Sequence, residues 1–153
     1  MANTYSQIYL QFVFAVKFRE SCIHEKWKGE LYKYITGIIR NNGHTSIVIN
    51  GMADHIHLFV GFHPKQSISE FMKDVKAASS KWINDRNFTK GKFAWQEGYG
   101  VFSYGRSQMK DVINYIENQE MHHTKKSFKD EYIDFLKKYE IVFEEKYTFS
   151  DPV

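Results

Sequence analysis

Apolar residues occupy every second position near the start of the chain, a pattern that predicts a β-strand with one buried face. The positions are Ile8, Leu10, Phe12, Phe14 and Val16. The alternation returns at Ile56, Leu58, Val60 and Phe62 and predicts a second such strand. The apolar run 47–49 precedes it closely, so the two segments are expected to pair as an antiparallel hairpin. Its turn falls at Asn50-Gly51 or at the following Met52-Ala53-Asp54.

Helical periodicity appears in two longer segments that follow the first and third predicted strands. From His24 to about Asn42, apolar residues recur at intervals of three and four, and Gly43 provides a stop. Ser67 opens the next helix, which has Glu70 as its capping-box partner and runs to about Asn84. Both helices are therefore expected to be amphipathic and to pack against the sheet.

The second half of the chain predicts one more strand and two C-terminal helices. Residues 93–96 have the composition of a fourth strand, and a turn-rich stretch and a short extended piece over 101–104 follow. Ser107 can cap a helix over about 107–121 that carries Tyr115. A sustained apolar stripe predicts the last helix over about 126–143.

The order strand, helix, strand, strand, helix, strand matches an α+β fold of the ferredoxin-like (RRM-like) type. This fold has a split β-α-β antiparallel sheet with helices on one face, to which this chain adds the two C-terminal helices. The other sheet face is expected to be open. His55 and His57 point away from Ile56 and Leu58, so we expect both imidazoles on the open face, accessible without opening the core.

Composition is consistent with one domain over residues 1–153, because a chain of this length with 42% hydrophobic residues can bury a single core. The N-terminal residues lack the features of a signal peptide, and no apolar run approaches the roughly 18 residues of a membrane span. We therefore expect a cytoplasmic protein without a membrane partner. Cys22 is the single cysteine, which argues against a disulfide framework.

Charge is concentrated in the middle of the chain, where residues 63–95 carry seven Lys or Arg against three Asp or Glu. Such a segment can bind phosphates, although a solvated helix face gives the same pattern. The candidate DNA-binding residues are Lys73, Lys76, Lys81 and Arg86. Aromatic residues make up 17% of the chain and could supply base-stacking surfaces, but most are expected in the core.

The candidate chemistry lies in two runs some sixty residues apart. His55 and His57 stand on one side of a strand, about 7 Å apart, where two imidazoles can close on one divalent cation. Tyr115 and Gln119 lie four residues apart on a helix, so a phenol and an amide share one face. Each motif alone also fits a structural role. His122-His123 follows directly and is interpreted as a helix end, with a ligand role as the alternative.

Taken together, these pieces resemble the HUH endonucleases, and in particular the single-tyrosine transposases of small hairpin-ended insertion sequences, the insertion-sequence-200-like family. The resemblance extends over nearly the whole chain. It is carried by the runs 52–58, 95–103, 115–123 and 126–128, in this order. Ala53 departs from the proline expected in many relatives, which should alter turn rigidity and leave the chemistry unchanged.

The resemblance implies cleavage and rejoining of single-stranded DNA at hairpin-marked ends. Tyr115 would be the catalytic nucleophile, leaving a 5′-phosphotyrosine and a free 3′-hydroxyl, and His55, His57 and Gln119 would hold Mg²⁺ or Mn²⁺. It also implies single-stranded DNA hairpins as partners and a homodimer whose active sites are shared between subunits. An unperturbed phenol has a pKa near ~10, so positioning and charge neutralisation must supply the catalysis.

Three alternatives stay open at the level of the sequence. One is a non-catalytic module that binds single-stranded nucleic acid on the same fold. Another is a zinc hydrolase in which His122 or His123 joins His55 and His57 and water is the nucleophile. The third is a domesticated relative that cleaves chromosomal repeat hairpins.

Overall fold

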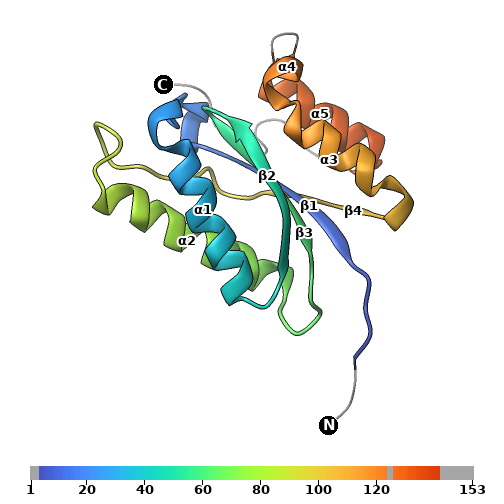
Figure 1. The fold of residues 1–153 in the computed structure, drawn as a ribbon. Coiled ribbons are helices and arrows are strands. Elements are labelled where there is room, and N and C mark those ends of the chain that lie inside the picture. The colour runs from blue at the N-terminus through green and yellow to red at the C-terminus, as the bar shows by residue number, and fades with distance from the viewer. Residues whose placement is uncertain (1–3, 124–125, 142–153) are drawn as a thin grey trace.

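The computed structural model describes residues 4–123 and 126–141. Within them the chain forms a four-stranded sheet and five α-helices (Figure 1). The strands are β1 Tyr9–Ala15, β2 Thr45–Met52, β3 His55–Gly61 and β4 Gly100–Tyr104. The helices are α1 Glu25–Asn41, α2 Ile68–Asp85, α3 Met109–Glu117, α4 Gln119–His123 and α5 Phe128–Lys138.

The sheet has the strand order β2-β3-β1-β4 with every neighbouring pair antiparallel. This is the order of a split β-α-β, ferredoxin-like sheet, and the predicted fold class is confirmed. Strands β1 and β3 are central, and their register places Val13 opposite His57 and Ala15 opposite His55. The histidines are therefore held in the middle of the sheet and not at an edge.

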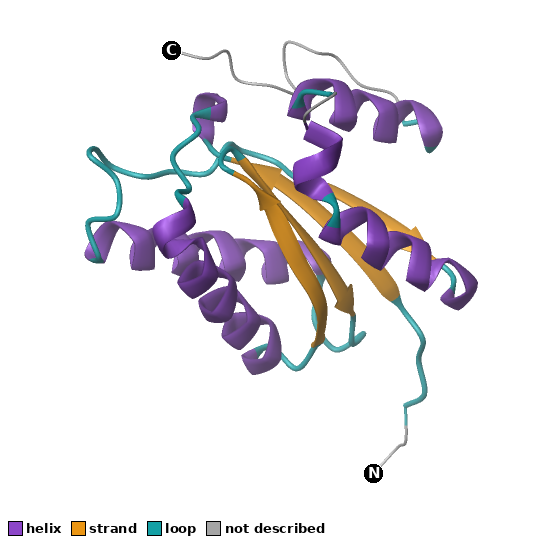
Figure 2. Ribbon diagram, turned by 45° about the horizontal axis from the view of Figure 1, so that its top comes forward, coloured by secondary structure: helices purple, strands orange, loops and turns teal. Residues whose placement is uncertain are grey.

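One face of the sheet packs against α1 and α2, and Figure 2 shows the sheet between these two helices and the C-terminal ones. The alternation predicted for β1 and β3 accounts for this core, because the even-numbered positions of both strands point into it. The core includes Leu10, Phe12, Phe14, Ile56, Leu58, Val60, Leu31, Ile35, Ile39, Phe71, Met72 and Val75. Of the capping box predicted for α2, the Ser67 N-cap is present, since its side chain accepts from the Glu70 backbone N–H at 3.1 Å.

The expectation of an open second face is wrong, because α3, α4 and α5 cover it. His55 and His57 are both 0% exposed. The reason is that two odd-numbered positions of β1, Val13 and Ala15, are apolar as well. Val13 and Ala15 pack with Phe102 and with the stripe of α5, so closing this face buries a second hydrophobic cluster. The members contributed by α5 are Phe128, Tyr132 and Leu136.

The fourth strand begins later than predicted. Residues 93–96 form only an isolated bridge between Trp95 and Val16, and the strand proper is β4. Asn84 explains the difference, because its side chain accepts from the Phe93 N–H at 2.7 Å and donates to the Phe93 carbonyl at 3.0 Å. This contact ties the start of the segment to α2, and only its end reaches the sheet, where the Gln96 N–H donates to the Ala15 carbonyl at 2.8 Å.

The helix predicted over 107–121 is divided in the structure. A short 3-10 turn at Arg106–Gln108 precedes α3, and Asn118 separates α3 from α4. Ser107 is therefore not the cap; the Gln108 side chain accepts from the Gly105 N–H at 2.9 Å. The last helix is α5, capped by Ser127, and the predicted residues 142–143 lie outside the described part.

The hairpin turn between β2 and β3 is the later of the two alternatives, because Met52 pairs with His55 and two residues lie between them.

None of the helices between residues 4 and 123 or 126 and 141 has the length and apolar character needed to span a bilayer.

Candidate active site

His55 and His57 project from β3 toward the C-terminal helices, with ring centroids 5.2 Å apart. The Nδ1 of His55 lies 2.7 Å from the Asp54 carboxylate. A carboxylate can only accept, so Nδ1–H is the donor of this contact and Nε2 is turned toward the site. Nε2 faces the Gln119 Oε1 at 3.0 Å. A carboxylate behind a histidine is the arrangement that orients an imidazole toward a metal ion.

His57 has a different partner behind it. Its Nδ1 lies 2.8 Å from the amide Nε2 of Gln11, a residue on β1 that is only 1% exposed. Gln11 in turn accepts a hydrogen bond from the Tyr104 hydroxyl at 2.8 Å. On the other side of the ring, Nε2 of His57 lies 3.1 Å from the carboxylate of Glu131. The second imidazole is thus oriented by an amide and faces a buried carboxylate.

Glu131 is a residue of the site that the sequence analysis missed. It is 4% exposed, and its Oε1 also lies 3.5 Å from Nε2 of His55. The ligand atoms of His55, His57 and Glu131 all lie within 4.8 Å of one another. The signal available in the sequence was a carboxylate on the apolar face of the last helix, since Phe128 and Phe135 lie three residues before and four after it.

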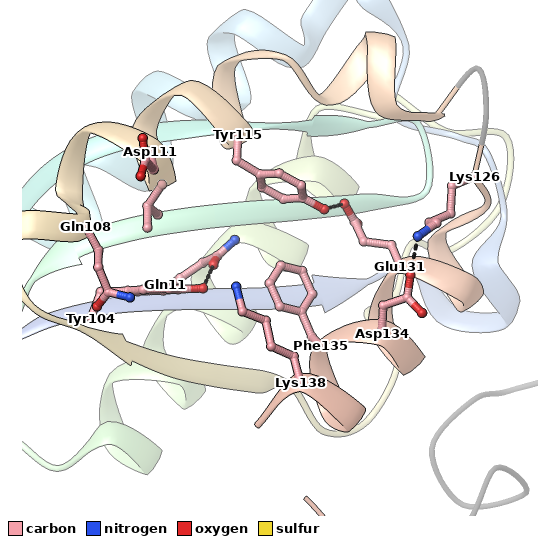
Figure 3. Close-up of a pocket in the computed structure, with 11 residues that line it drawn as sticks. Gln11, Tyr104, Gln108, Asp111, Tyr115, Lys126, Glu131, Asp134, Phe135 and Lys138 are labelled. Atoms are coloured by element: carbon pink, nitrogen blue, oxygen red, sulfur yellow. Dashed lines mark hydrogen bonds and ion pairs between the residues drawn. The ribbon is translucent and has the colours of Figure 1, made fainter. Parts of the chain in front are cut away.

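Tyr115 and Gln119 reach the same carboxylate although a break separates their helices. The Tyr115 hydroxyl donates to Glu131, and Nε2 of Gln119 lies 3.2 Å from the Glu131 Oε2. Asn50 on β2 fixes the end of α3 by donating to the carbonyls of Ile116 and Glu117 at 2.9 and 3.1 Å. The phenol, the amide and both imidazoles therefore meet at one buried carboxylate. Figure 3 shows two members of this cluster, Tyr115 and Glu131.

The environment of Tyr115 keeps its phenol protonated. Burial raises the pKa of Tyr115 well above its ordinary value, and the negative charge of Glu131 raises it further. A phenol in this state is a hydrogen-bond donor and a weak nucleophile. Any chemistry at Tyr115 therefore needs positive charge near its oxygen, which a cation held by His55, His57 and Glu131 would supply.

The candidate DNA-binding residues lie on the other layer of the molecule. Lys73, Lys76 and Lys81 lie on α2 and Arg86 is its C-cap. This helix packs on the sheet face opposite the histidines. Lys73, Lys81 and Arg86 are exposed, whereas the Lys76 ammonium donates to the carbonyls of Gln96 and Gly98. The structure does not bring these residues to the His-Tyr cluster.

His122 and His123, the other ligand candidates, close α4. Their side chains lie outside the described part of the chain.

Comparison with known families matches residues 4–119 to the family described as "Transposase IS200 like". Among curated proteins, the chain is 26% identical over 122 residues to the ISDra2 transposase TnpA of Deinococcus radiodurans, covering 74% of this chain and 84% of that protein. It is 29% identical over 129 residues to the transposase for insertion sequence element IS200 of Salmonella typhimurium, covering 78% of this chain and 81% of that protein.

Solved structures share the fold. A proposed transposase from Deinococcus radiodurans superposes with a TM-score of 0.62 at 24% identity, covering 78% of this chain and 96% of that one. A REP-associated tyrosine transposase bound to a REP hairpin superposes with a TM-score of 0.61 at 13% identity, covering 80% and 73%. With more than half of its length matched by the family profile, the chain belongs to the IS200-like transposase family.

Proposed function

We propose that this transposase cleaves and rejoins single-stranded DNA at hairpin-marked element ends through a 5′-phosphotyrosine formed on Tyr115, with a divalent metal ion. The observation that supports this most directly is the meeting of the Tyr115 hydroxyl with the carboxylate that borders both imidazoles. A nucleophile and a cation site are thereby adjacent within one chain, which is what attack on a phosphodiester requires.

The side chains present fit a divalent ion. Ligand atoms about 2.1 Å from a shared ion lie at most about 4.2 Å apart, so a set already within 4.8 Å needs only small side-chain movements. His55, His57 and Gln119 are the proposed ligands, and we add Glu131 to them because its carboxylate lies beside both imidazoles. Mixed nitrogen and oxygen ligands suit Mn²⁺, and Mg²⁺ is the abundant alternative. Such an ion supplies charge neutralisation at the scissile phosphate.

The residues of the chain then carry the reaction. The Tyr115 oxygen attacks phosphorus, the P–O3′ bond breaks, the phenol proton passes to a carboxylate, and the leaving 3′-oxygen takes a proton from water. Glu131 already accepts the hydrogen bond from this phenol, so its carboxylate is placed to take the proton as the bond to phosphorus forms. The phosphotyrosine keeps the energy of a phosphodiester, and a 3′-hydroxyl can reverse the step without ATP.

Substrate entry requires a local rearrangement. Both histidines and Gln119 are 0% exposed, and Glu131 lies between the phenol and the imidazoles. A phosphate reaching the site would require the Glu131 side chain or α5 to shift beside the imidazoles, with the carboxylate staying within reach of the Tyr115 hydroxyl. The described conformation is then the substrate-free one.

We further propose hairpin DNA as the partner, which is supported by the REP hairpin in the related solved structure. Lys73, Lys81 and Arg86 would contact its phosphates away from the active site, and Lys76 would join them only by leaving the Gln96 and Gly98 carbonyls. All the residues of the cluster come from one chain, so the site can form within one subunit. A homodimer that exchanges the tyrosine helix stays a prediction.

The test is incubation of the full chain with labelled single-stranded hairpins from the DNA flanking its coding region, with Mg²⁺ or Mn²⁺, followed by denaturing electrophoresis. We expect a covalent protein–DNA adduct that disappears in Tyr115→Phe and persists in Tyr34→Phe, a change on α1. An adduct that persists in Tyr115→Phe would overturn the assignment of the nucleophile. Cleavage without any adduct would indicate water as the nucleophile and contradict the proposal.

A further inference from the structure

A cavity of about 440 Å³ opens beside Tyr115, between the sheet, α3 and α5 (Figure 3). Its volume falls in the range of small-molecule sites, roughly 300–1,000 Å³. The lining residues that matter for its chemistry are Gln11, Tyr104, Gln108, Tyr115, Phe135 and Lys138. Because Tyr115 and Glu131 form part of its wall, anything bound in the cavity lies next to the proposed nucleophile.

Two aromatic rings give the cavity a surface suited to a planar ligand. Phe135 stacks on Phe102 with centroids 5.0 Å apart and meets the Tyr115 ring edge-on at 5.7 Å. Tyr104 is held by an edge-on contact to Phe59 at 6.1 Å and by its hydrogen bond to Gln11. Both rings are therefore fixed before any ligand arrives, and stacking on fixed aromatic rings is how proteins bind unpaired bases.

The wall carries carboxylates as well as cations, and two of its polar groups, those of Lys138 and Gln108, are placed to bind a nucleotide. Lys138 extends from α5 into the cavity toward the sheet (Figure 3), and among the described residues it makes a cation–π contact with Tyr139 and no ion pair. The other cavity lysine, Lys126, is already paired with Asp134. Gln108 uses its Oε1 on the Gly105 N–H, and no described residue accepts from its Nε2. One cation and one amide donor are therefore available to a ligand.

We propose that this cavity binds the nucleotide next to the scissile phosphate, with its base against Phe135 and Tyr104, its base edge at Gln108, and its outer phosphate at Lys138. The inference rests on the proposed function, since Tyr115 defines which phosphate is scissile. A nucleotide between Tyr115 and Lys138 has one phosphate at each end. The cavity would thus hold the strand in register and contribute to the choice of cleavage site.

The test measures binding of the four deoxynucleoside 3′,5′-bisphosphates to the full chain by calorimetry, with deoxyribose 3,5-bisphosphate as the probe that lacks a base. We expect weak but saturable binding, with one base preferred and the baseless probe bound at least about tenfold more weakly. Lys138→Ala should weaken bisphosphate binding about tenfold, as expected for loss of a charge-assisted hydrogen bond. The matched control is Lys137→Ala, an exposed neighbour that does not line the cavity.

Gln108→Glu provides a second variant, because it keeps the acceptor for Gly105 and removes the amide donor. It should reduce the preference among bases. Equal binding of the baseless probe, or unchanged binding in both variants, would overturn the subsite. This outcome can be told apart from that of the proposed function. If the probes bind as expected but no DNA adduct forms, the subsite is supported and the phosphotyrosine is contradicted. If an adduct forms but both variants bind the probes unchanged, the phosphotyrosine is supported and the subsite is contradicted.

Discussion

The hydroxyl of Tyr115 donates a hydrogen bond to the carboxylate of Glu131, which joins α3 to α5 across the covered face of the sheet. The other oxygen of the same carboxylate lies 3.1 Å from Nε2 of His57. One side chain therefore touches both the proposed nucleophile and the proposed metal site. A cation bound by Glu131 at the proposed metal site would therefore change the hydrogen-bond acceptor of the Tyr115 hydroxyl.

Replacing Glu131 with Gln should weaken metal binding. The amide keeps the shape and an oxygen but loses the negative charge, so we expect the Mn²⁺ dissociation constant to rise at least about tenfold. In the metal-free chain the same change should leave the thermal midpoint unchanged or raised, because a buried charge is removed. Mn²⁺ titration followed by electron paramagnetic resonance measures the first effect. Glu117→Gln, at an exposed position of α3, is the control, and equal affinities in the two variants would remove Glu131 from the ligand set.

Gln11 is expected to orient His57 for the metal. In the described arrangement the Gln11 amide nitrogen faces Nδ1, so Nδ1 accepts and Nε2 carries the proton. Binding a cation at Nε2 requires the opposite tautomer, in which Nδ1–H donates. The amide must then turn over, so that its oxygen faces His57 and its nitrogen faces Tyr104.

Two variants of Gln11 should shift metal affinity in opposite directions. Gln11→Glu places acceptors toward both His57 and Tyr104 and should tighten Mn²⁺ binding. Gln11→Met removes the partner and should weaken binding by about 10–100-fold, as is usual for groups that orient a metal-bound histidine. Calorimetry of metal binding, with Tyr104→Phe as a milder comparison, measures both. Identical affinities for the Glu and Met variants would show that Gln11 has no orienting role.

The sequence predicted those features that depend on neighbouring residues in the chain. Alternation identified β1 and β3 and placed both histidines on one side of a strand, and the cap at Ser67 located the start of α2. Spacing placed Tyr115 and Gln119 together, even though Asn118 divides their helix. These signals are local, since they follow from the geometry of a single strand or helix.

Features that depend on packing between distant segments were not predicted. A carboxylate on the apolar stripe of α5 indicates burial, but the identity of its partners depends on how α5 crosses the sheet. The same holds for the covered face, since Val13 and Ala15 look like ordinary strand residues until Phe128 packs on them. The site was therefore predicted as two separate pairs, and the residue that connects them was missed.

Lys76 should make stability depend on pH. Burial lowers the pKa of Lys76 from its ordinary 10.5 to about 8, and its ammonium donates to the Gln96 and Gly98 carbonyls. Between these two pH values the unfolded chain binds more protons than the folded one, so the free energy of unfolding contributed by this residue rises with pH. The rise should be on the order of 1 kcal/mol, since solvent screens a half-buried group.

Chemical denaturation checks this. Wild type and Lys76→Met are compared in steps of about one pH unit across the range set by the two pKa values. The difference between the two proteins should grow in favour of wild type as pH rises. Lys73→Met, an exposed neighbour on α2, should give a constant difference. If the free energy of unfolding changes with pH in the same way for all three proteins, the lowered pKa of Lys76 does not contribute to stability.

The basic face of α2 should determine how strongly hairpin binding depends on salt. Lys73 and Arg86 are exposed, and Arg86 lies over the Trp82 ring at 5.2 Å, which holds its guanidinium at the surface. If each contacts one phosphate, its replacement by Ala releases one fewer counterion and lowers the slope of log Kd against log salt by about 0.7–0.9. Fluorescence anisotropy with a labelled hairpin between about 50 and 200 mM salt measures this slope. Lys33→Ala, an exposed change on α1, is the control; equal slopes in all variants would place the phosphates on another face.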